Sequence, residues 1–431
     1  MAIFEGLEDS VDTHMKEEMW GVSQSASKDF NFIASPYARQ LAYHGIHEVG
    51  QMFVDLAPLE GACTFVSYPV ANKWIVGRTF DFEGGKIFDE EKVLKWVYPQ
   101  KGYKYVSVIW TGMVGAVSGV NEKGIYVSIN AAGSKDVNLR GLPSTLIVAK
   151  VLQEAGNIEE ALRIFRDNDS MVTDIYMVLD SNSNRLFKVE KSALEIEMTE
   201  IKDPRAVANH LEAKVFENDD FNKARRDDYT SLYRQKRAQD LLNELKKKKL
   251  GREETLQALL KILRDKGIDD QSKPLHLGNR RAIDALIASH GVLYDSKTMT
   301  FYVSEGPAMV GAFHGFDIQK SFAEAKPVEV AKLPMDPLVT VPQYRELKAK
   351  LSELKAIYRL ILESRCKEAY DKLQTMSFVH VEYETAFVHA ALCLKKDDEA
   401  KAHAKIALSL APPQRALGEF LEEVVKGHEK N

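Results

Sequence analysis

Two short stretches decide how this chain folds: Gly-Ala-Cys-Thr-Phe at 61–65 and Gly-Arg-Thr-Phe-Asp at 77–81. A cysteine attacks an amide well only as a thiolate or with a base beside it. If the chain is cut before Cys63, the new α-amine, with an ordinary pKa of about 7.7–8.0, can act as that base. The stretches therefore predict a nucleophilic Cys63 that depends on cutting the Ala62–Cys63 bond, with Asp81 orienting the amine and Arg78 beside the thiol.

Two asparagines are candidate donors to the oxyanion that such an attack creates. Asn130 ends a predicted strand at 125–130, and Asn209 follows the apolar run 206–208. Each residue also has a purely structural interpretation. Cys63 fits a packing residue at the start of a strand, Asp81 fits a turn cap, and Asn130 fits a side chain bonded to its own backbone.

Five ordered motifs carry a resemblance to a known family. They are Cys63-Thr64, the run 77–81, the Gly-x-Asn-Glu-x-Gly turn at 119–124, Asn130, and Asn209-His210. Together they resemble the choloylglycine hydrolase and acyl-coenzyme A:isopenicillin N acyltransferase (peptidase C45) branch of the N-terminal nucleophile hydrolases. Acid ceramidase is a more distant relative. The resemblance extends over about residues 30–320.

The resemblance implies a four-layer αββα fold of the α+β class and self-cleavage between Ala62 and Cys63. Cys63 would be nucleophile and base, Asp81 would orient the amine, Arg78 would support the pocket, and Asn209 with Asn130 would stabilise the oxyanion. This chain departs from the family pattern where Thr79 replaces an asparagine and Ala62 replaces a glycine. The family's further arginine stays open between Arg234 and Arg281.

Composition shifts divide the chain into three predicted parts. Residues 1–62 are predicted to be helical, with Val11, Met15 and Met19 on one face, and to stay bound after cleavage as a small subunit. Residues 63–326 carry alternating strands and helix pairs and form the predicted core. After a proline-rich linker, residues 343–431 are predicted to form tetratricopeptide-like helical hairpins.

The overall composition excludes several classes of protein. The 431 residues carry a net charge of -5, so we expect no nucleic-acid partner. The lysine run 246–249 is interpreted as a solvated helix face. Three cysteines are too few for a disulfide scaffold, and Cys366 and Cys393 are predicted to be packing residues.

The sequence predicts neither a cofactor nor a metal. His44 and His47 have a spacing that could bind metal but lack a third ligand nearby, and we find no phosphate-binding loop. No apolar run reaches the length of about 18–20 residues that a membrane span needs, and the N-terminus lacks signal-peptide features. We expect a cytoplasmic protein with no indicated membrane association, whose helical tail mediates self-association.

The leading hypothesis is an autoproteolytic amidohydrolase or acyltransferase that acts on a linear, non-peptide amide through a thioester. Its partners would be a small-molecule amide and, for transfer, an acyl acceptor. Penicillins, N-acyl amino acids, fatty-acid amides and bile-salt conjugates all stay open as substrates. Two alternatives are a phospholipase B-like ester hydrolase and an inactive core whose helical tail docks a partner.

Overall fold

The computed structural model describes residues 6–45, 48–50, 62–82, 87–268, 277–307 and 309–427. Within them, two antiparallel sheets of seven strands form the core. The first sheet has the order β10-β1-β2-β11-β12-β13-β14 and the second runs from β3 to β9 in sequence order. The first comprises β1 Thr64–Val70, β2 Lys73–Asp81, β10 Arg205–Val207, β11 Ala288–Asp295, β12 Thr300–Ser304, β13 Phe313–Asp317 and β14 Glu329–Leu333. The second comprises β3 Lys92–Val97, β4 Tyr105–Trp110, β5 Ser118–Asn121, β6 Ile125–Ala131, β7 Asp174–Asp180, β8 Arg185–Lys191 and β9 Ile196–Ile201.

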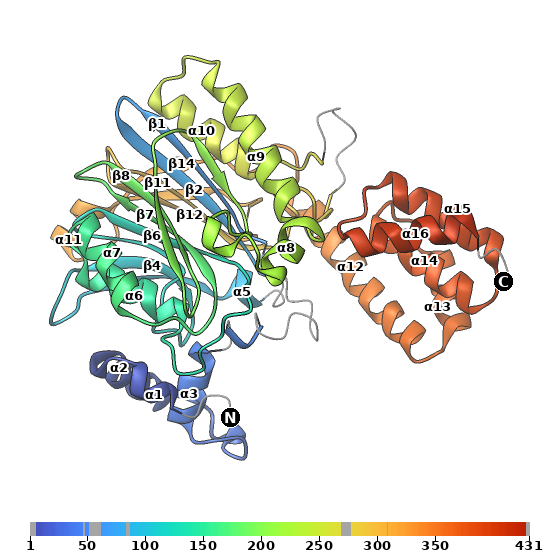
Figure 1. Cartoon of the computed structure of the whole chain (residues 1–431), viewed down its shortest axis with the longest axis horizontal. Coiled ribbons are helices and arrows are strands. Elements are labelled where there is room, and N and C mark those ends of the chain that lie inside the picture. Colours follow the sequence, from blue (N-terminus) through green and yellow to red (C-terminus); the bar gives the residue numbers. More distant parts are fainter. Residues whose placement is uncertain are drawn as a thin grey trace.

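The two sheets pack face to face and helices cover their outer sides (Figure 1). Phe65 and Val292 of the first sheet share one buried cluster with Val120 and Met177 of the second. Helices α6 (Ser144–Glu154) and α7 (Ile158–Asp167) contact the second sheet, and α9 (Ser231–Lys246) and α10 (Arg252–Leu263) contact the first. The predicted α+β class and its four αββα layers are therefore confirmed.

Local sequence explains where the covering helices begin. Asn157 caps α7, because its Oδ1 accepts a bond of 2.9 Å from the Glu160 backbone N–H. Ile158, Ala161 and Phe165 then recur on one buried face of the helix. Pro143 directly precedes α6, whose residues Leu146, Ile147 and Val151 are buried.

The N-terminal helices pack against the core. They are α1 (Leu7–Ser10), α2 (Thr13–Ser23) and α3 (Pro36–His44). The predicted stripe of Val11, Met15 and Met19 is buried in the same hydrophobic cluster as Leu146 of α6 and Cys63. The N-terminal helices are thus held on the core by apolar contacts as well as by their covalent link to it.

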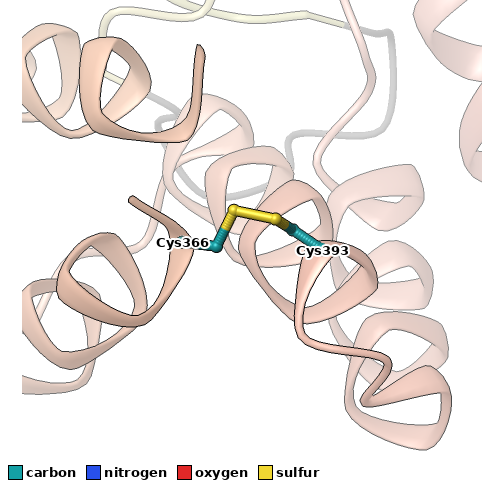
Figure 2. Close-up of a disulfide and its surroundings, with 2 residues drawn as sticks. All are labelled: Cys366 and Cys393. Atoms are coloured by element: carbon teal, nitrogen blue, oxygen red, sulfur yellow. A yellow bond between two sulfur atoms is a disulfide. The ribbon is translucent and has the colours of Figure 1, made fainter. Parts of the chain in front are cut away.

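The C-terminal helices stack in sequence order beside the core (Figure 1). They are α12 (Val341–Leu362), α13 (Cys366–Thr375), α14 (Val381–Cys393), α15 (Asp397–Ser409) and α16 (Arg415–Lys426). Cys366 and Cys393 form a disulfide, as Figure 2 shows, so the prediction that they are unbonded packing residues is wrong. The bond forms because α13 begins and α14 ends at the same end of their hairpin, with the two Cα atoms 6.1 Å apart.

The first sheet extends past residue 326, the predicted end of the core, since β14 pairs with β13. This edge strand is mostly exposed and shows no alternation of apolar residues, which is why the sequence does not indicate it. Short helices α5 (Ile87–Glu90), α8 (Asp220–Asp227) and α11 (Ile318–Glu324) complete the core. Among the described residues, no helix combines the length and the apolar character needed to cross a bilayer.

The helical region is attached to the core at several points. Leu347 of α12 lies in a hydrophobic cluster with Leu286 and Val310 of the core. The Asn279 side chain donates to the Leu410 carbonyl at 2.8 Å, and the Arg415 backbone N–H donates to the Asp228 carbonyl at 3.0 Å. A hydrophobic cluster and hydrogen bonds therefore join the core to the C-terminal helices.

Candidate active site

Cys63 directly precedes β1 and lies beside β2. Thr64 pairs with Thr79, and the Ala62 backbone N–H donates to the Asp81 carbonyl at 3.1 Å, which continues the antiparallel ladder. Because side chains alternate between the faces of a strand, Cys63 shares one face with Arg78, and Asp81 lies on the other. Thr79, the departure from the family pattern, accepts a bond of 3.2 Å from the Thr64 backbone N–H.

Arg78 is fully buried and donates to the Cys63 sulfur at 3.2 Å. Its other donors reach across to the second sheet: the Ser118 hydroxyl at 2.8 Å, the Val117 carbonyl at 3.2 Å, and the Ile129 carbonyl. The guanidinium thus places a fixed positive charge next to the sulfur and ties the sulfur's position to both sheets.

Sequence reasoning missed two side chains that continue this network. The Ser118 hydroxyl, which accepts from Arg78, lies 3.2 Å from Nε2 of His290. The His290 ring stacks on Phe80 with centroids 5.2 Å apart, and burial lowers the pKa of His290 well below its ordinary value. Neutral His290 therefore shares a hydrogen bond with the Ser118 hydroxyl, and the tautomer of the ring sets which of the two donates. The sequence shows His290 only as one of several scattered histidines, because the contact joins strands of different sheets.

Arg234, from α9, binds the backbone around the predicted cleavage bond. Its Nη1 lies 3.1 Å from the Ala62 carbonyl oxygen, 2.7 Å from that of Cys63 and 2.9 Å from the Thr64 hydroxyl. Its Nη2 donates to Oδ1 of Asn209 at 2.7 Å. Arg281 instead lies 4.1 Å over the Tyr233 ring. Of the two arginines that the sequence leaves open, the geometry places Arg234 at the Cys63 backbone.

Asp81 is 1% exposed, and burial raises its pKa to about 7. The positive charges of Arg234, Arg280 and Arg78 oppose this shift, whereas the negative charge of Asp284 adds to it. Among the described residues, Oδ2 of Asp81 is buried without a hydrogen-bond partner. At neutral pH the carboxyl is therefore poised between its protonated and ionised forms.

The two predicted oxyanion donors, Asn130 and Asn209, each donate from the side chain to backbone carbonyls beside the other asparagine. Asn130 of β6 donates to the carbonyls of Val207 and Ala208, at 3.2 and 3.0 Å. Asn209 donates to the Ala131 carbonyl at 2.7 Å. An amide nitrogen has two N–H groups, so Asn130 uses both, and Asn209 uses one for a described acceptor.

The remaining sequence motifs have structural roles here. Asn121 closes its turn by accepting from the Lys123 and Ile125 backbone N–H groups, both at 3.0 Å. His44 lies 2.8 Å from the Gln40 carbonyl through Nδ1 and accepts from the Val114 N–H through Nε2. His47 lies outside the described residues. Within the described ranges, His, Cys, Asp and Glu form no group of three or more that could hold a metal.

Comparison with known proteins places part of the chain in a family context. Residues 70–282 match the model of the acyl-coenzyme A:6-aminopenicillanic acid acyl-transferase family. The matched range begins after Cys63 and contains Arg78, Asp81, Asn209 and Arg234. It agrees with the resemblance that the sequence motifs carry.

Individual relatives are distant. An uncharacterized protein of Archaeoglobus fulgidus is 27% identical over 108 residues, which are 25% of this chain and 18% of that protein. The match thus spans less than a fifth of the relative's length. Among solved structures, the N-acylethanolamine-hydrolyzing acid amidase ortholog of Caenorhabditis elegans is 12% identical with a TM-score of 0.39, covering 54% of this chain and 92% of that chain. A variant of conjugated bile acid hydrolase from Clostridium perfringens is 11% identical with a TM-score of 0.42, covering 64% of this chain and 100% of that chain.

Proposed function

We propose that this chain, a relative of the N-terminal nucleophile hydrolases, cuts itself at Ala62–Cys63 and then cleaves a linear, non-peptide C–N amide as a hydrolase or acyltransferase. One observation carries the proposal. Arg78 donates to the Cys63 sulfur while Arg234 donates to the Ala62 carbonyl oxygen. The attacking atom and the oxygen of the adjoining peptide bond are thus both held by buried guanidinium groups.

The self-cleavage step follows from these contacts. The Cys63 sulfur attacks the Ala62 carbonyl carbon, and the negative charge that develops on its oxygen is stabilised by Arg234. The C–N bond then breaks, which leaves a thioester between the two residues and a free α-amine on Cys63. The thiol proton is passed on to the departing nitrogen, which leaves as a neutral amine. Water hydrolyses the thioester and frees the sulfur.

The mature reaction repeats this chemistry on a substrate. The new amine takes the proton from the Cys63 thiol, Asp81 orients the amine, and the sulfur attacks the substrate amide. The leaving amine departs with the proton, and the thioester passes its acyl group to water or to an acceptor amine. The second N–H of Asn209 and the Arg234 guanidinium face this carbonyl as oxyanion donors in our proposal. Asn130, whose amide N–H groups are both used, positions the strand ends.

Intact-mass measurement of the purified protein tests the proposal. Wild type should yield two fragments, 1–62 and 63–431, and the Cys63→Ala variant should remain a single chain. A Cys63→Ser variant that is cut but turns over no amide would separate maturation from catalysis. A single uncut chain with full amide turnover would contradict the proposal.

A panel of matched esters and amides decides the type of substrate. Amide turnover that disappears in Cys63→Ala supports the proposal. Turnover of esters alone would favour the phospholipase B-like alternative, and an uncut wild type that turns over neither would favour an inactive core.

A further inference from the structure

Side chains of α9 accept hydrogen bonds from the backbone segment that leads into Asn209. The acceptors, which form an acceptor row, are Ser231, Gln235 and Gln239. Their side-chain oxygens lie 2.8, 3.0 and 2.9 Å from the backbone nitrogens of Asn209, Ala208 and Ala206, respectively. Because the three acceptors follow one another at intervals of four residues, they share one face of the helix. That face of α9 therefore runs along the segment 206–209.

The acceptor row completes an edge strand. β10 is an edge strand of the first sheet, and it pairs with β1, which directly follows Cys63. Alternate backbone N–H groups of an edge strand point away from its partner strand and need another acceptor when they are buried. The two glutamines supply this acceptor to Ala206 and Ala208, which are both buried. The row therefore sets the position of α9 along β10.

Ser231 ends the acceptor row at the candidate active site. Its hydroxyl accepts from the Asn209 backbone N–H and shares a hydrogen bond of 2.8 Å with Nδ1 of His210, so one oxygen holds two successive residues. Arg234 lies in the same helical turn and donates from Nη2 to Oδ1 of Asn209 at 2.7 Å. One turn of α9 thus binds Asn209 at both its backbone and its side chain.

The Ser231 hydroxyl is not easily replaced by water. Ser231 and Asn209 are each 2% exposed, so solvent does not reach the Asn209 backbone N–H. A buried N–H that loses its acceptor is costly, and the backbone shifts to reduce this cost. Such a shift moves the side-chain amide of Asn209 relative to Arg234. A displacement of about 1 Å in a catalytic constellation lowers a rate by up to about 10²-fold.

We propose that Ser231 is a positioning residue for the reaction of Cys63: its hydroxyl sets the place of Asn209 against Arg234, so that both donors meet the carbonyl that the sulfur attacks. The inference rests on the proposed function, because it gives Ser231 a part in that reaction. Ser231 acts through Asn209 and takes no part in making or breaking bonds. Gln235, the next acceptor along the row, supports the same placement from one turn away.

Self-cleavage tests this role without any added substrate. We expect Ser231→Ala to cut at Ala62–Cys63 about tenfold more slowly than wild type, measured as the uncut fraction by intact mass at timed intervals after synthesis. Gln235→Met, at a half-buried position, removes the neighbouring acceptor and should slow the cut to a smaller extent.

The matched control is Ser321→Ala in α11. Ser321 is also a buried helical serine, and its hydroxyl accepts from the Val328 backbone N–H at 2.9 Å. It lies toward the other edge of the first sheet from β10, since α11 contacts β13. Ser321→Ala loses the same kind of bond and should cut at the wild-type rate. Equal slowing in Ser231→Ala and Ser321→Ala would show a general loss of stability and overturn the inference.

A double-mutant cycle with Asn209→Ala separates positioning from a purely structural role. Asn209→Ala removes the side chain through which Ser231 acts, so adding Ser231→Ala to it should slow self-cleavage no further. A second tenfold loss in Ser231→Ala/Asn209→Ala would overturn the inference. If Ser231→Ala fails to fold, Gln235→Met takes its place in the same cycle, and its slowing should likewise disappear in the Asn209→Ala background.

The outcomes also separate this inference from the proposed function. Wild type that cuts itself, with Ser231→Ala cutting equally fast, would overturn the role of Ser231 while the proposed function stands. Wild type that stays a single chain would overturn the proposed function, and the role of Ser231 in it would fall as well.

Discussion

Arg234 of α9 binds the peptide unit between Ala62 and Cys63: its Nη1 donates to the Ala62 carbonyl at 3.1 Å and to the Cys63 carbonyl at 2.7 Å. Both carbonyls flank the peptide nitrogen that would become the new α-amine. One buried side chain therefore fixes the orientation of this peptide unit relative to the sulfur.

Arg234→Gln should slow self-cleavage by about 10²–10³-fold, because it removes a charged donor from the oxygen that becomes negative. The measurement is the uncut fraction by intact mass at timed intervals after synthesis. Arg281→Gln is the control, since Arg281 stacks on Tyr233, and should cut at the wild-type rate. Equal rates in wild type and Arg234→Gln would show that Arg234 is not the oxyanion donor.

Arg78→Lys should lower amide turnover at least about tenfold, although it keeps the positive charge. A single ammonium group does not reproduce the planar set of donors that reaches the Cys63 sulfur and Ser118 together. The rate of Cys63 alkylation by iodoacetamide should fall in parallel, which links the loss to the sulfur. Arg185→Lys, on the remote strand β8, is the control. Unchanged alkylation in Arg78→Lys would assign Arg78 a purely structural role.

Asp81 should make the uncut precursor less stable as the pH rises. Its folded pKa of about 7 lies above the ordinary 3.8, so the folded state binds a proton that the unfolded state has lost across that range. The stabilisation is complete below about pH 3.8 and is lost as the pH rises through about 7.

The experiment compares Tm at pH 5 and pH 8 for Cys63→Ala and for Cys63→Ala/Asp81→Asn, both of which should stay uncut. The Tm of the first protein should fall more between the two pH values than that of the second. An identical pH response of both proteins would show that Asp81 has an ordinary pKa in the precursor.

The Cys366–Cys393 disulfide should stabilise the C-terminal helices by about 3 kcal/mol, since it closes a loop with a sequence separation of 27 residues. Urea unfolding of Cys366→Ala/Cys393→Ala, followed by circular dichroism, should show an earlier transition. Dithiothreitol should reproduce this effect in wild type and leave the double variant unchanged. A wild-type transition that dithiothreitol does not move would contradict the prediction.

The sequence predicts those parts of the fold that depend on local patterns. The strand Tyr105–Trp110 coincides with a run of mostly apolar residues, and the helix Ser144–Glu154 directly follows Pro143. The edge strand Glu329–Leu333 is not indicated by such a pattern, because most of its residues are exposed and Leu333 is its one buried residue.

The candidate site is predictable only in part for the same reason. Cys63, Arg78 and Asp81 lie on neighbouring strands joined by a short turn, so their spacing along the chain reflects their spacing in the fold. The choice between Arg234 and Arg281 depends on how α9 packs on the first sheet. The contact of Ser118 with His290 depends on how the two sheets stack. Neither relationship leaves a pattern in the sequence.

The crossed bonds of Asn130 and Asn209 also limit how the two sheets can move. Each sheet region offers a side-chain amide to a backbone carbonyl of the other, at Ala208 and Ala131. Sliding one sheet over the other would break both bonds at once. The spacing between the two sheets is therefore fixed at this end, beside Cys63.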